Sequence, residues 1–332
     1  MNDPLLIVGG GQAGFSVASK LRTMGDERPI TIISDEMFPP YQRPPLSKKY
    51  LLGETQKERL FFRSSNWYQE NNVGLRLEAP LGAILPKEKT VQLKTGENLK
   101  YQKLVLTMGA RALTLPETLG GHHRGIYSIR TLSDVDMIKH EFQPRRTLLV
   151  VGGGYVGLEA ASIASKLGLR VIVIEKEDRI LKRVAAIATS DYFRELHVSK
   201  GVQIHESTSL IKLIGKGGRV TNAVLSSGEN VEVDFVICGI GIKPNDELAK
   251  EAGLEVSDGI IVNNQCQTSD PDILAAGDCA SFLYRNNLIR LESVQNAIDQ
   301  GAAVAETLSG GQSPYNPHPW FWSDQFDVKL QI

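Results

Sequence analysis

Two short runs of aliphatic residues, each followed directly by a glycine-rich phrase, form the clearest hydrophobic pattern in the chain. The runs are residues 5–8 and 148–151, and the phrases are residues 9–14 and 152–157. An unbroken apolar run of this length predicts a strand buried on both faces, as in a parallel sheet. The residues after the glycines predict a helix in both places. The pattern therefore indicates the same strand, turn and helix unit twice.

The spacing of the glycines predicts two turns that hold dinucleotides. The first glycine of each phrase makes the tight turn, the second lets the backbone approach a pyrophosphate, and the third lets the helix pack on its strand. The helix that follows offers unpaired N–H groups and its positive dipole end to the phosphates. The residues assigned to the turns are Gly9, Gly11, Gln12, Ala13 and Gly14 in the first, and Gly152, Gly154, Tyr155, Val156 and Gly157 in the second.

Acidic residues follow the next apolar run after each phrase, which strengthens this interpretation over an ordinary glycine turn. The strand expected at residues 29–36 ends on Asp35 and Glu36, and the strand expected at residues 171–175 ends on Glu175. A carboxylate at this place accepts a hydrogen bond from a ribose hydroxyl. Glu175 would also repel a 2′-phosphate, so NADH is expected over NADPH, although the basic Lys176 lies beside it.

Length and composition are those of an ordinary globular protein. With 332 residues the chain is long for one core, so two or three domains are expected. Hydrophobic residues make up 42%, charged residues 23%, and the net charge is −1, which favours neither a nucleic acid nor an anionic membrane as a partner. No apolar run is long enough to span a bilayer, so a cytoplasmic protein is expected.

The cysteines exclude several kinds of chemistry. Cys238, Cys266 and Cys279 have neither paired nor metal-ligand spacing, so no iron–sulfur or zinc site is expected. No cysteine precedes residue 238. Dithiol chemistry is therefore disfavoured.

A third phrase, residues 268–278, carries a resemblance to a known family. It consists of a turn, a short apolar strand and Asp278, and it resembles the late flavin-binding segment of two-dinucleotide flavoprotein reductases. A plain Gly-Asp turn remains the alternative for this segment alone. The resemblance implies an α/β fold with two Rossmann-like, glutathione-reductase-like domains, in which the first glycine phrase binds FAD and the second binds NADH. The NAD domain, about residues 113–244, would be inserted into an FAD domain of residues 1–112 and 245–318.

Residues 40–48 narrow the resemblance. They are similar to the R-P-x-L-S-K motif of the NADH-dependent ferredoxin and rubredoxin reductases of oxygenase systems, with monodehydroascorbate reductases as close relatives. Two prolines stiffen this loop, and its cations lie near a phosphate or the reactive edge of the flavin. The resemblance implies that Lys48 is catalytic. It assigns the same role to Glu159, whose alternative is a salt bridge on a helix face.

The same resemblance implies the remaining site residues. Met108 stands where the family usually has threonine, so a hydroxyl contact to flavin is replaced there. The helix expected after Ser293 would direct its dipole at the flavin. Further FAD positions are Asp35, Glu36, Arg43, Pro44, Lys48, Ala79, Met108, Gly109, Arg130, Asp278, Glu292, Ser293, Val294 and Trp320. Further NAD positions are Glu159, Glu175, Arg183, Ile240 and Gly241.

Residues 320–325 resemble the W-F-W-S-D-Q motif that opens a third, C-terminal α+β domain in the family. Residues 319–332 are therefore expected to be the start of that domain, most of which is absent from the chain, and to end in its first strand.

The expected reaction passes a hydride from NADH to FAD and then single electrons to a ferredoxin-type iron–sulfur protein or a rubredoxin. A monodehydroascorbate reductase-like enzyme and an NADH-responsive flavoprotein switch are the alternatives. A monomer or a homodimer is expected.

Overall fold

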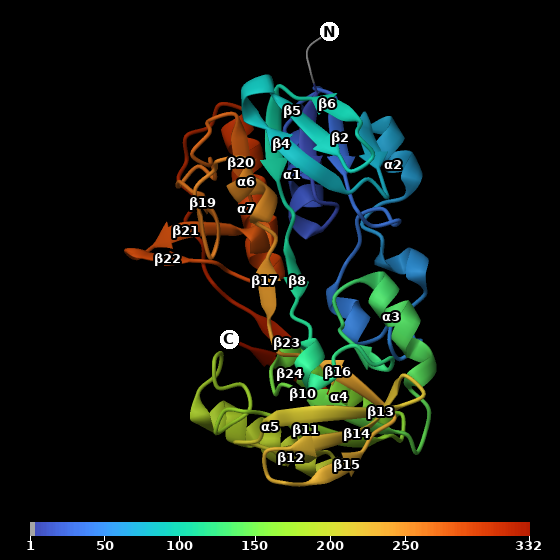
Figure 1. Cartoon of the computed structure of the whole chain (residues 1–332). Helices are drawn as coiled ribbons and strands as arrows, with labels where there is room; N and C mark the ends of the chain where they lie inside the picture. Colours follow the sequence, from blue (N-terminus) through green and yellow to red (C-terminus); the bar gives the residue numbers. More distant parts are fainter. Residues whose placement is uncertain (1–3) are drawn as a thin grey trace. The chain divides into compact units, whose positions relative to one another are not determined.

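The structure is a computed structural model that describes residues 4–332, and it divides into two compact units. The first unit contains the described residues up to Gln42, Glu58–Arg111 and Pro244–Phe321. The second unit contains Arg43–Lys57, Ala112–Lys243 and Trp322–Ile332. Residues 43–57, which were assigned above to the FAD domain, thus group with the inserted segment. Figure 1 shows the elements of both units.

A five-stranded parallel sheet forms the centre of the first unit. Its order is β20-β7-β1-β2-β3, and all four pairings are parallel. The strands are β1 (Leu5–Val8), β2 (Ile30–Ile33), β3 (Val73–Arg76), β7 (Lys103–Leu106) and β20 (Ile273–Ala275). Every residue of β1 is buried, as the unbroken apolar run requires for a central strand.

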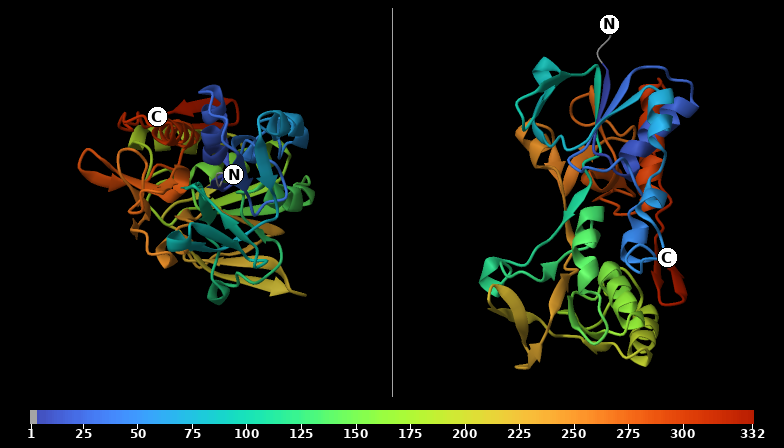
Figure 2. Two further views of the ribbon diagram at one scale, coloured as in Figure 1. Left: turned by 90° about the horizontal axis from the view of Figure 1, so that it is seen from above. Right: turned by 90° about the vertical axis from the view of Figure 1, so that its right-hand side faces the viewer.

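Helices and small sheets complete the first unit. The long helices α1 (Gln12–Thr23) and α7 (Val294–Leu308) lie side by side, as both Figure 1 and Figure 2 show. The short helices are α2 (Ser65–Glu70) and α6 (Glu247–Glu251). One small sheet contains β4 (Leu81–Leu85), β5 (Thr90–Leu93) and β6 (Asn98–Lys100). Another contains β18 (Val256–Ser257), β19 (Gly259–Val262), β21 (Ala280–Tyr284) and β22 (Asn287–Ile289).

The second unit repeats this plan. Its parallel sheet has the order β12-β11-β10-β16-β9. The strands are β9 (Ile126–Tyr127), β10 (Thr147–Val151), β11 (Arg170–Ile174), β12 (Gln203–His205) and β16 (Phe235–Cys238). The helices are α3 (Leu132–Ile138), α4 (Tyr155–Lys166) and α5 (Ile187–Ser199). An antiparallel meander contains β13 (Leu210–Lys216), β14 (Arg219–Leu225) and β15 (Asn230–Glu232).

The repeat extends well beyond the glycine phrases. In each unit a first strand, a glycine turn and a helix are followed by two strands on one side of the first strand, then by a three-stranded antiparallel meander. The chain then returns through a strand on the other side, β7 in one unit and β16 in the other. Strands β8 (Ala110–Ala112) and β17 (Ile242–Pro244) pair where the chain passes between the units.

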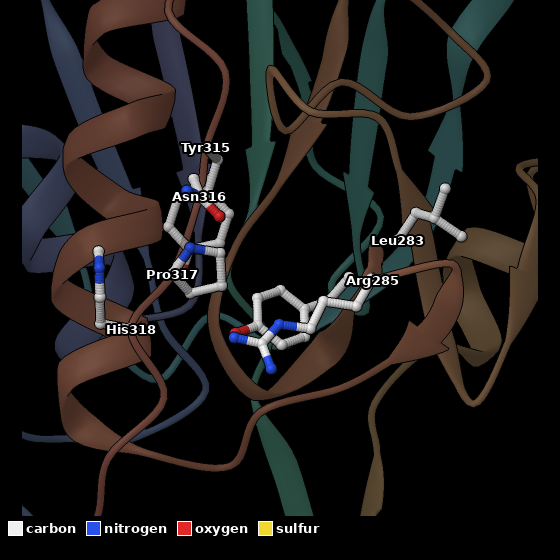
Figure 3. Close-up of a pocket in the computed structure, with 7 residues that line it drawn as sticks. Leu283, Arg285, Tyr315, Asn316, Pro317 and His318 are labelled. Carbon is white, nitrogen blue, oxygen red and sulfur yellow. The ribbon is translucent and has the colours of Figure 1, made fainter.

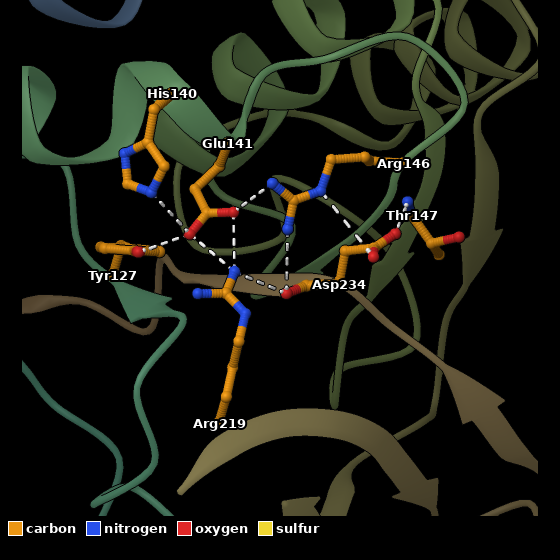
Figure 4. Close-up of polar contacts among 7 residues, drawn as sticks. All are labelled: Tyr127, His140, Glu141, Arg146, Thr147, Arg219 and Asp234. Atoms are coloured by element: carbon orange, nitrogen blue, oxygen red, sulfur yellow. Dashed lines mark hydrogen bonds and ion pairs between the residues drawn. The ribbon is translucent and has the colours of Figure 1, made fainter. Parts of the chain in front are cut away.

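A buried carboxylate fastens the meander of the second unit to its parallel sheet (Figure 4). Glu141 has no exposed side-chain surface and accepts hydrogen bonds from Arg219 Nη2 at 2.7 Å and Tyr127 Oη at 2.6 Å. Arg146 Nη1 lies 2.5 Å from its other oxygen. Burial alone would raise the pKa of Glu141, but the hydrogen bonds from Arg219 and Tyr127 and the charge of Arg146 outweigh it and lower the pKa.

The fold confirms the expected α/β class with two parallel sheets. Two local expectations need correction. The strand before the first acids ends at Ile33, so Asp35 and Glu36 lie in the following bend rather than on the strand. The end of the chain forms a hairpin, β23 (Trp322–Gln325) paired with β24 (Val328–Gln331), instead of one lone strand. No helix among residues 4–332 is long and apolar enough to cross a membrane.

Candidate functional site

The first glycine turn is packed tightly at its two ends and open in the middle. Gly9 has a φ of +118°, and a methyl group there would lie 2.1 Å from the Thr107 carbonyl oxygen. A methyl group on Gly14 would lie 2.2 Å from the carbonyl oxygen of Gly9. At Gly11 a methyl group would meet no atom within 4 Å. The turn therefore needs glycine at its ends for folding, whereas Gly11 leaves space beside the helix N-terminus.

The second glycine turn has the same three properties. Gly152 has a φ of +106°, and a methyl group there would lie 2.4 Å from the carbonyl oxygen of Gly239. A methyl group on Gly157 would lie 2.3 Å from the Gly152 carbonyl oxygen, but one on Gly154 would meet nothing within 4 Å. Both turns thus leave a place where a pyrophosphate fits against the first turn of a helix, at α1 and at α4.

Near the first turn, Glu36 is the acid whose position is fixed. Tyr41 Oη donates a 2.6 Å hydrogen bond to Glu36 Oε2, and Tyr41 is buried. Asp35 is exposed and precedes it in the bend. The backbone N–H of Ala79 donates to the Ser34 carbonyl oxygen at 2.8 Å, just after β2 ends. Of the two acids, Glu36 therefore has the better geometry for a ribose hydroxyl.

The turn that contains Asp278 lies against the start of α1. Gly277 has a φ of +80°, and a methyl group there would lie 3.0 Å from Cβ of Ala13. Its N–H donates to Oε1 of the buried Gln300 at 2.8 Å. Arg290 donates to the backbone oxygen of Asp278 at 3.1 Å. The structure thus brings Asp278 together with the first glycine turn inside the first unit.

The helix expected after Ser293 is α7, and it begins at Val294. Ser293 is its N-cap, since its hydroxyl oxygen accepts the N–H of Asn296 at 3.1 Å. Glu292 precedes the cap and pairs with Arg290 at 2.8 Å. Because this ion pair occupies one carboxylate oxygen of Glu292, fewer acceptor positions are left for a ligand than the sequence indicates.

Around Met108 the structure adds residues that the sequence did not indicate. Thr107, one position earlier, is buried and donates through Oγ1 to the carbonyl oxygens of Val8 and Gly9, both at 3.0 Å. Asn245 donates from Nδ2 to the Met108 carbonyl oxygen at 2.8 Å. Its backbone N–H donates to Gly109 at 3.0 Å. Position 108 has no hydroxyl, but Thr107 has one, and its two hydrogen bonds stabilise the first glycine turn.

In the second unit Glu175 contacts the glycine turn directly. Its Oε2 accepts the backbone N–H of Gly153 at 2.7 Å, and its Oε1 accepts that of Glu177 at 2.9 Å. Arg179 does not offer a free cation beside it. Its Nη1 donates to the Ser190 hydroxyl at 2.6 Å and to the Ala185 carbonyl oxygen at 2.9 Å. The hydrogen bonds of Arg179 thus hold its guanidinium against the turn that leads to α5.

Arg183, Ile240 and Gly241 lie in the turns around this site. Arg183 is exposed, in the turn between β11 and α5. Ile240 is 38% exposed, and Gly241 has a φ of +114°. Gly239, beside them, is the residue that packs against Gly152. The glycines after β16 were expected to approach a nucleotide, and this contact with the turn was not expected.

Lys48 and Glu159 form an ion pair inside the second unit. Lys48 Nζ lies 3.1 Å from Glu159 Oε1, and the carboxylate side chain is only 6% exposed. Ser47 Oγ donates to Glu159 Oε2 at 2.5 Å and Ser323 Oγ donates to Oε1 at 2.8 Å. Lys48 Nζ also lies 3.6 Å from Asp324. The sequence indicated the two residues separately, and the pairing is a result of the fold.

The other predicted flavin residues divide between the units. Arg43 and Arg130 are both in the second unit, where Arg43 Nη1 donates to the Arg130 carbonyl oxygen at 2.8 Å. Pro44 begins the 3₁₀ turn Pro44–Ser47 that leads to Lys48. Trp320 is in the first unit and is 39% exposed.

The thiols have the properties of packed side chains. Cys238, Cys266 and Cys279 are free and buried. Burial raises the pKa of Cys238 and of Cys266 to about 12, and that of Cys279 to about 11. Protonated buried thiols are poor nucleophiles.

A cavity of about 300 Å³ lies in the first unit, between the β21–β22 hairpin and the segment before Trp320 (Figure 3). It is lined by Leu283, Tyr284, Arg285, Tyr315, Asn316, Pro317 and His318. Arg285 and His318 are exposed, and none of the lining residues was assigned a role by the sequence. No predicted site residue therefore lines this cavity.

Comparison with known proteins identifies the family. Residues 3–301 match the pyridine nucleotide-disulphide oxidoreductase family. Rhodocoxin reductase of Rhodococcus erythropolis is 38% identical over 330 residues, which cover 99% of this chain and 77% of that protein. Rubredoxin-NAD(+) reductase of Pseudomonas putida is 38% identical over 329 residues, 98% of this chain and 85% of the relative.

Solved structures agree with the sequence matches. The putidaredoxin reductase in a covalent complex with putidaredoxin has a TM-score of 0.95 at 38% identity, covering 99% of this chain and 81% of the other. The ferredoxin reductase for the CYP199A2 system of Rhodopseudomonas palustris gives 0.96 at 39% identity, with coverage of 99% and 82%. The chain belongs to the pyridine nucleotide-disulphide oxidoreductase family, a family of flavoprotein oxidoreductases that use FAD and NAD(P)H. This confirms the resemblance drawn from the motifs.

Proposed function

We propose that the chain is an NADH-dependent flavoprotein reductase that passes single electrons to a ferredoxin-type iron–sulfur protein. A bound flavin would accept two electrons together as a hydride and release them one at a time. The observation that carries the proposal is the matched pair of glycine turns, in which Gly11 and Gly154 leave open space at the start of α1 and α4. FAD is assigned to the first turn, with Glu36 and Asp278, and NADH to the second, with Glu175.

The protein residues would bind and orient rather than act as strong bases. Each helix N-terminus presents unpaired N–H groups to a pyrophosphate. Lys48 would place a cation beside the flavin, and Glu159 would hold that cation in place through the 3.1 Å ion pair. Arg43 and Arg130, which contact each other, would add positive charge in the same unit. Positive charge of this kind favours the reduced, anionic flavin.

The names of the relatives support an iron–sulfur or rubredoxin acceptor. One related reductase is seen in a covalent complex with putidaredoxin, and another is a rubredoxin reductase. We infer an acceptor of this kind for this chain. We also propose that it works in the cytoplasm, as a monomer or a homodimer.

Anaerobic mixing with NADH tests the proposal. The chain is loaded with FAD, and its flavin absorbance is followed after NADH is added, first alone and then with a [2Fe–2S] ferredoxin, a rubredoxin or ascorbate radical. We expect fast bleaching with NADH, slower bleaching with NADPH, and rapid reoxidation by one of the two iron proteins. Preferential reoxidation by ascorbate radical would favour the monodehydroascorbate reductase-like alternative. A long-lived reduced flavin without turnover would favour a switch, and failure to bind flavin would overturn all three.

A further inference from the structure

A continuous line of buried polar side chains runs from α5 to Lys48 within the second unit. Its members, in order, are His197, Gln325, Ser323, Glu159 and Lys48. The first three have no exposed surface, and Glu159 is 5% exposed. Strand β23 lies against α4, and its Ser323 and Gln325 occupy the same, buried face because side chains alternate along a strand.

Every hydrogen bond in this line points the same way, toward the carboxylate of Glu159. His197 Nε2 lies 2.8 Å from Gln325 Oε1, and Gln325 Nε2 donates to Ser323 Oγ at 3.2 Å. Ser323 Oγ donates in turn to Glu159 Oε1 at 2.8 Å. Glu159 thus receives the end of a chain of donors on the same oxygen that accepts from Lys48.

The line also assigns the tautomer of His197. An amide oxygen can only accept a hydrogen bond, so the proton of a neutral imidazole must be on Nε2. The other nitrogen, Nδ1, is buried and has no hydrogen-bond partner among residues 4–332. With the proton on Nε2, Nδ1 carries no hydrogen, so the buried ring leaves no donor unpaired. Burial lowers the pKa of His197 to about 4, so the ring is neutral at physiological pH.

We propose that Ser323, oriented by Gln325 and His197, is a positioning residue that holds the Glu159 carboxylate in place for Lys48. The inference rests on the proposed function, in which Lys48 acts beside the flavin, and it adds the β23–β24 hairpin to the parts on which that site depends. Without the Ser323 hydroxyl, Ser47 and Lys48 are the remaining partners of the Glu159 carboxylate among residues 4–332. The carboxylate can then rotate, and the ammonium is held less firmly between Glu159 and Asp324.

The chain offers a matched control for this inference. Ser162 is also buried on α4, and its hydroxyl donates to the backbone oxygen of the same residue, Glu159, at 2.8 Å. Ser162→Ala therefore removes a buried hydroxyl that bonds to the Glu159 backbone and leaves the hydrogen bonds of the Glu159 carboxylate in place. A comparison of Ser323→Ala with Ser162→Ala separates positioning of the carboxylate from a general loss of packing.

The first experiment does not need a functioning enzyme. The chain is treated briefly with acetic anhydride, and acetylation of Lys48 is measured by mass spectrometry relative to other lysines in the same sample. We expect Ser323→Ala to raise the relative rate at Lys48 severalfold and Ser162→Ala to leave it unchanged. Equal rates in the two variants would overturn the inference even if the chain proves to be an active reductase.

The second experiment measures flavin reduction by NADH in the same variants. Loss of one hydrogen bond to a charged group should lower the saturating reduction rate about tenfold, with the NADH dissociation constant little changed. Ser162→Ala should match the parent chain. If no variant, nor the parent, is reduced by NADH, the proposed function fails, and the acetylation result still decides whether Ser323 holds the Glu159–Lys48 pair.

The Gln325–His197 half has a spectroscopic test. Long-range ¹H–¹⁵N spectra of histidine-labelled protein at neutral pH should show His197 with its proton on Nε2. In Gln325→Leu we expect this single tautomer to become a mixture. A proton on Nδ1 in the parent chain, or a charged ring at neutral pH, would contradict the direction assigned to the hydrogen bonds.

Discussion

Gly153 and Glu175 are joined by a 2.7 Å hydrogen bond from the glycine N–H to the carboxylate Oε2. The other side of Gly153 is held as well, because its carbonyl oxygen accepts the N–H of Leu181 at 3.0 Å. Leu181 is buried and has a φ of +56°, a conformation that costs a non-glycine residue about 1–2 kcal/mol. Glu175 therefore has two roles in the proposed site. It stabilises the glycine turn through this hydrogen bond, and it would accept a hydrogen bond from the nucleotide.

Glu175→Ala should narrow the preference for NADH over NADPH. Removal of the carboxylate abolishes its repulsion of a 2′-phosphate and its hydrogen bond to a ribose, so the ratio of the two kcat/KM values should fall about tenfold, or about 1.4 kcal/mol. Steady-state reduction of an artificial acceptor measures the ratio. Asp178→Asn is the control, because Asp178 is an exposed acid in the same turn, paired with Lys182 at 3.2 Å. An unchanged ratio in Glu175→Ala would refute the assignment.

The glycines of the second turn should respond to alanine in opposite ways. Gly154→Ala introduces a methyl group into open space, so the fold should keep its thermal stability while NADH binding weakens about tenfold or more, because the methyl group occupies the place of the pyrophosphate. Gly152→Ala forces a strained φ and a contact of 2.4 Å with a backbone oxygen, so it should lower the melting temperature. Calorimetry gives both quantities.

Gly11→Ala is the corresponding change in the first turn. It should release FAD more readily without unfolding the chain, since a methyl group there also meets nothing within 4 Å. Retention of FAD through gel filtration is the measurement. Tight flavin binding in Gly11→Ala, together with weak NADH binding in Gly154→Ala, would mean that FAD is not held at the first turn.

Local patterns were sufficient to predict the turns, because their geometry depends on residues adjacent in sequence. The open position at Gly154 and the strained one at Gly152 follow from glycine spacing alone. The helix after Ser293 was likewise predicted from a local motif, and it begins at Val294. Such features need no knowledge of the tertiary fold.

The contacts of Glu159 could not be predicted, because they join segments far apart in sequence. Ser47 and Ser323 approach the same carboxylate from opposite ends of the chain. Both serines lie in motifs that carried the resemblance, residues 40–48 and 320–325, but neither motif indicates that its serine meets Glu159. Nothing near His197 indicates that it is buried. Only the fold, which places β23 and the 3₁₀ turn Pro44–Ser47 against α4, brings these side chains together.

Glu141→Gln should destabilise the second unit. The substitution removes the charge that Arg146 and Arg219 share in a fully buried position, which should lower the free energy of unfolding by about 3 kcal/mol. Chemical denaturation followed by circular dichroism measures the loss. Glu232→Gln, a change at an exposed position of β15 in the same unit, should have no effect. A loss equal to that of Glu232→Gln would show that the cluster in Figure 4 does not fasten the meander to the sheet.

The buried imidazole of His197 should make stability depend on pH in the acid range. Burial lowers its pKa to about 4 in the folded chain, whereas an unfolded histidine titrates near 6.5. Between these values the unfolded chain binds the additional proton, so the stabilisation is fully present above pH 6.5 and is lost as the pH falls to about 4. The loss should approach 3 kcal/mol, since each pKa unit corresponds to about 1.4 kcal/mol.

Denaturation curves at several pH values, in the parent chain and in His197→Gln, test this expectation. The variant lacks the titrating ring, so its free energy of unfolding should fall less steeply between pH 6.5 and 4 than that of the parent. His318→Gln is the matched control, because His318 is exposed and its replacement should leave the parent slope unchanged. Since His197 contacts Gln325 at 2.8 Å, the β23–β24 hairpin should become susceptible to proteolysis over the same pH range in the parent chain. Parallel slopes in the parent and His197→Gln would mean that the ring is already charged in the folded protein, and that carboxylates elsewhere determine the acid limit of its stability.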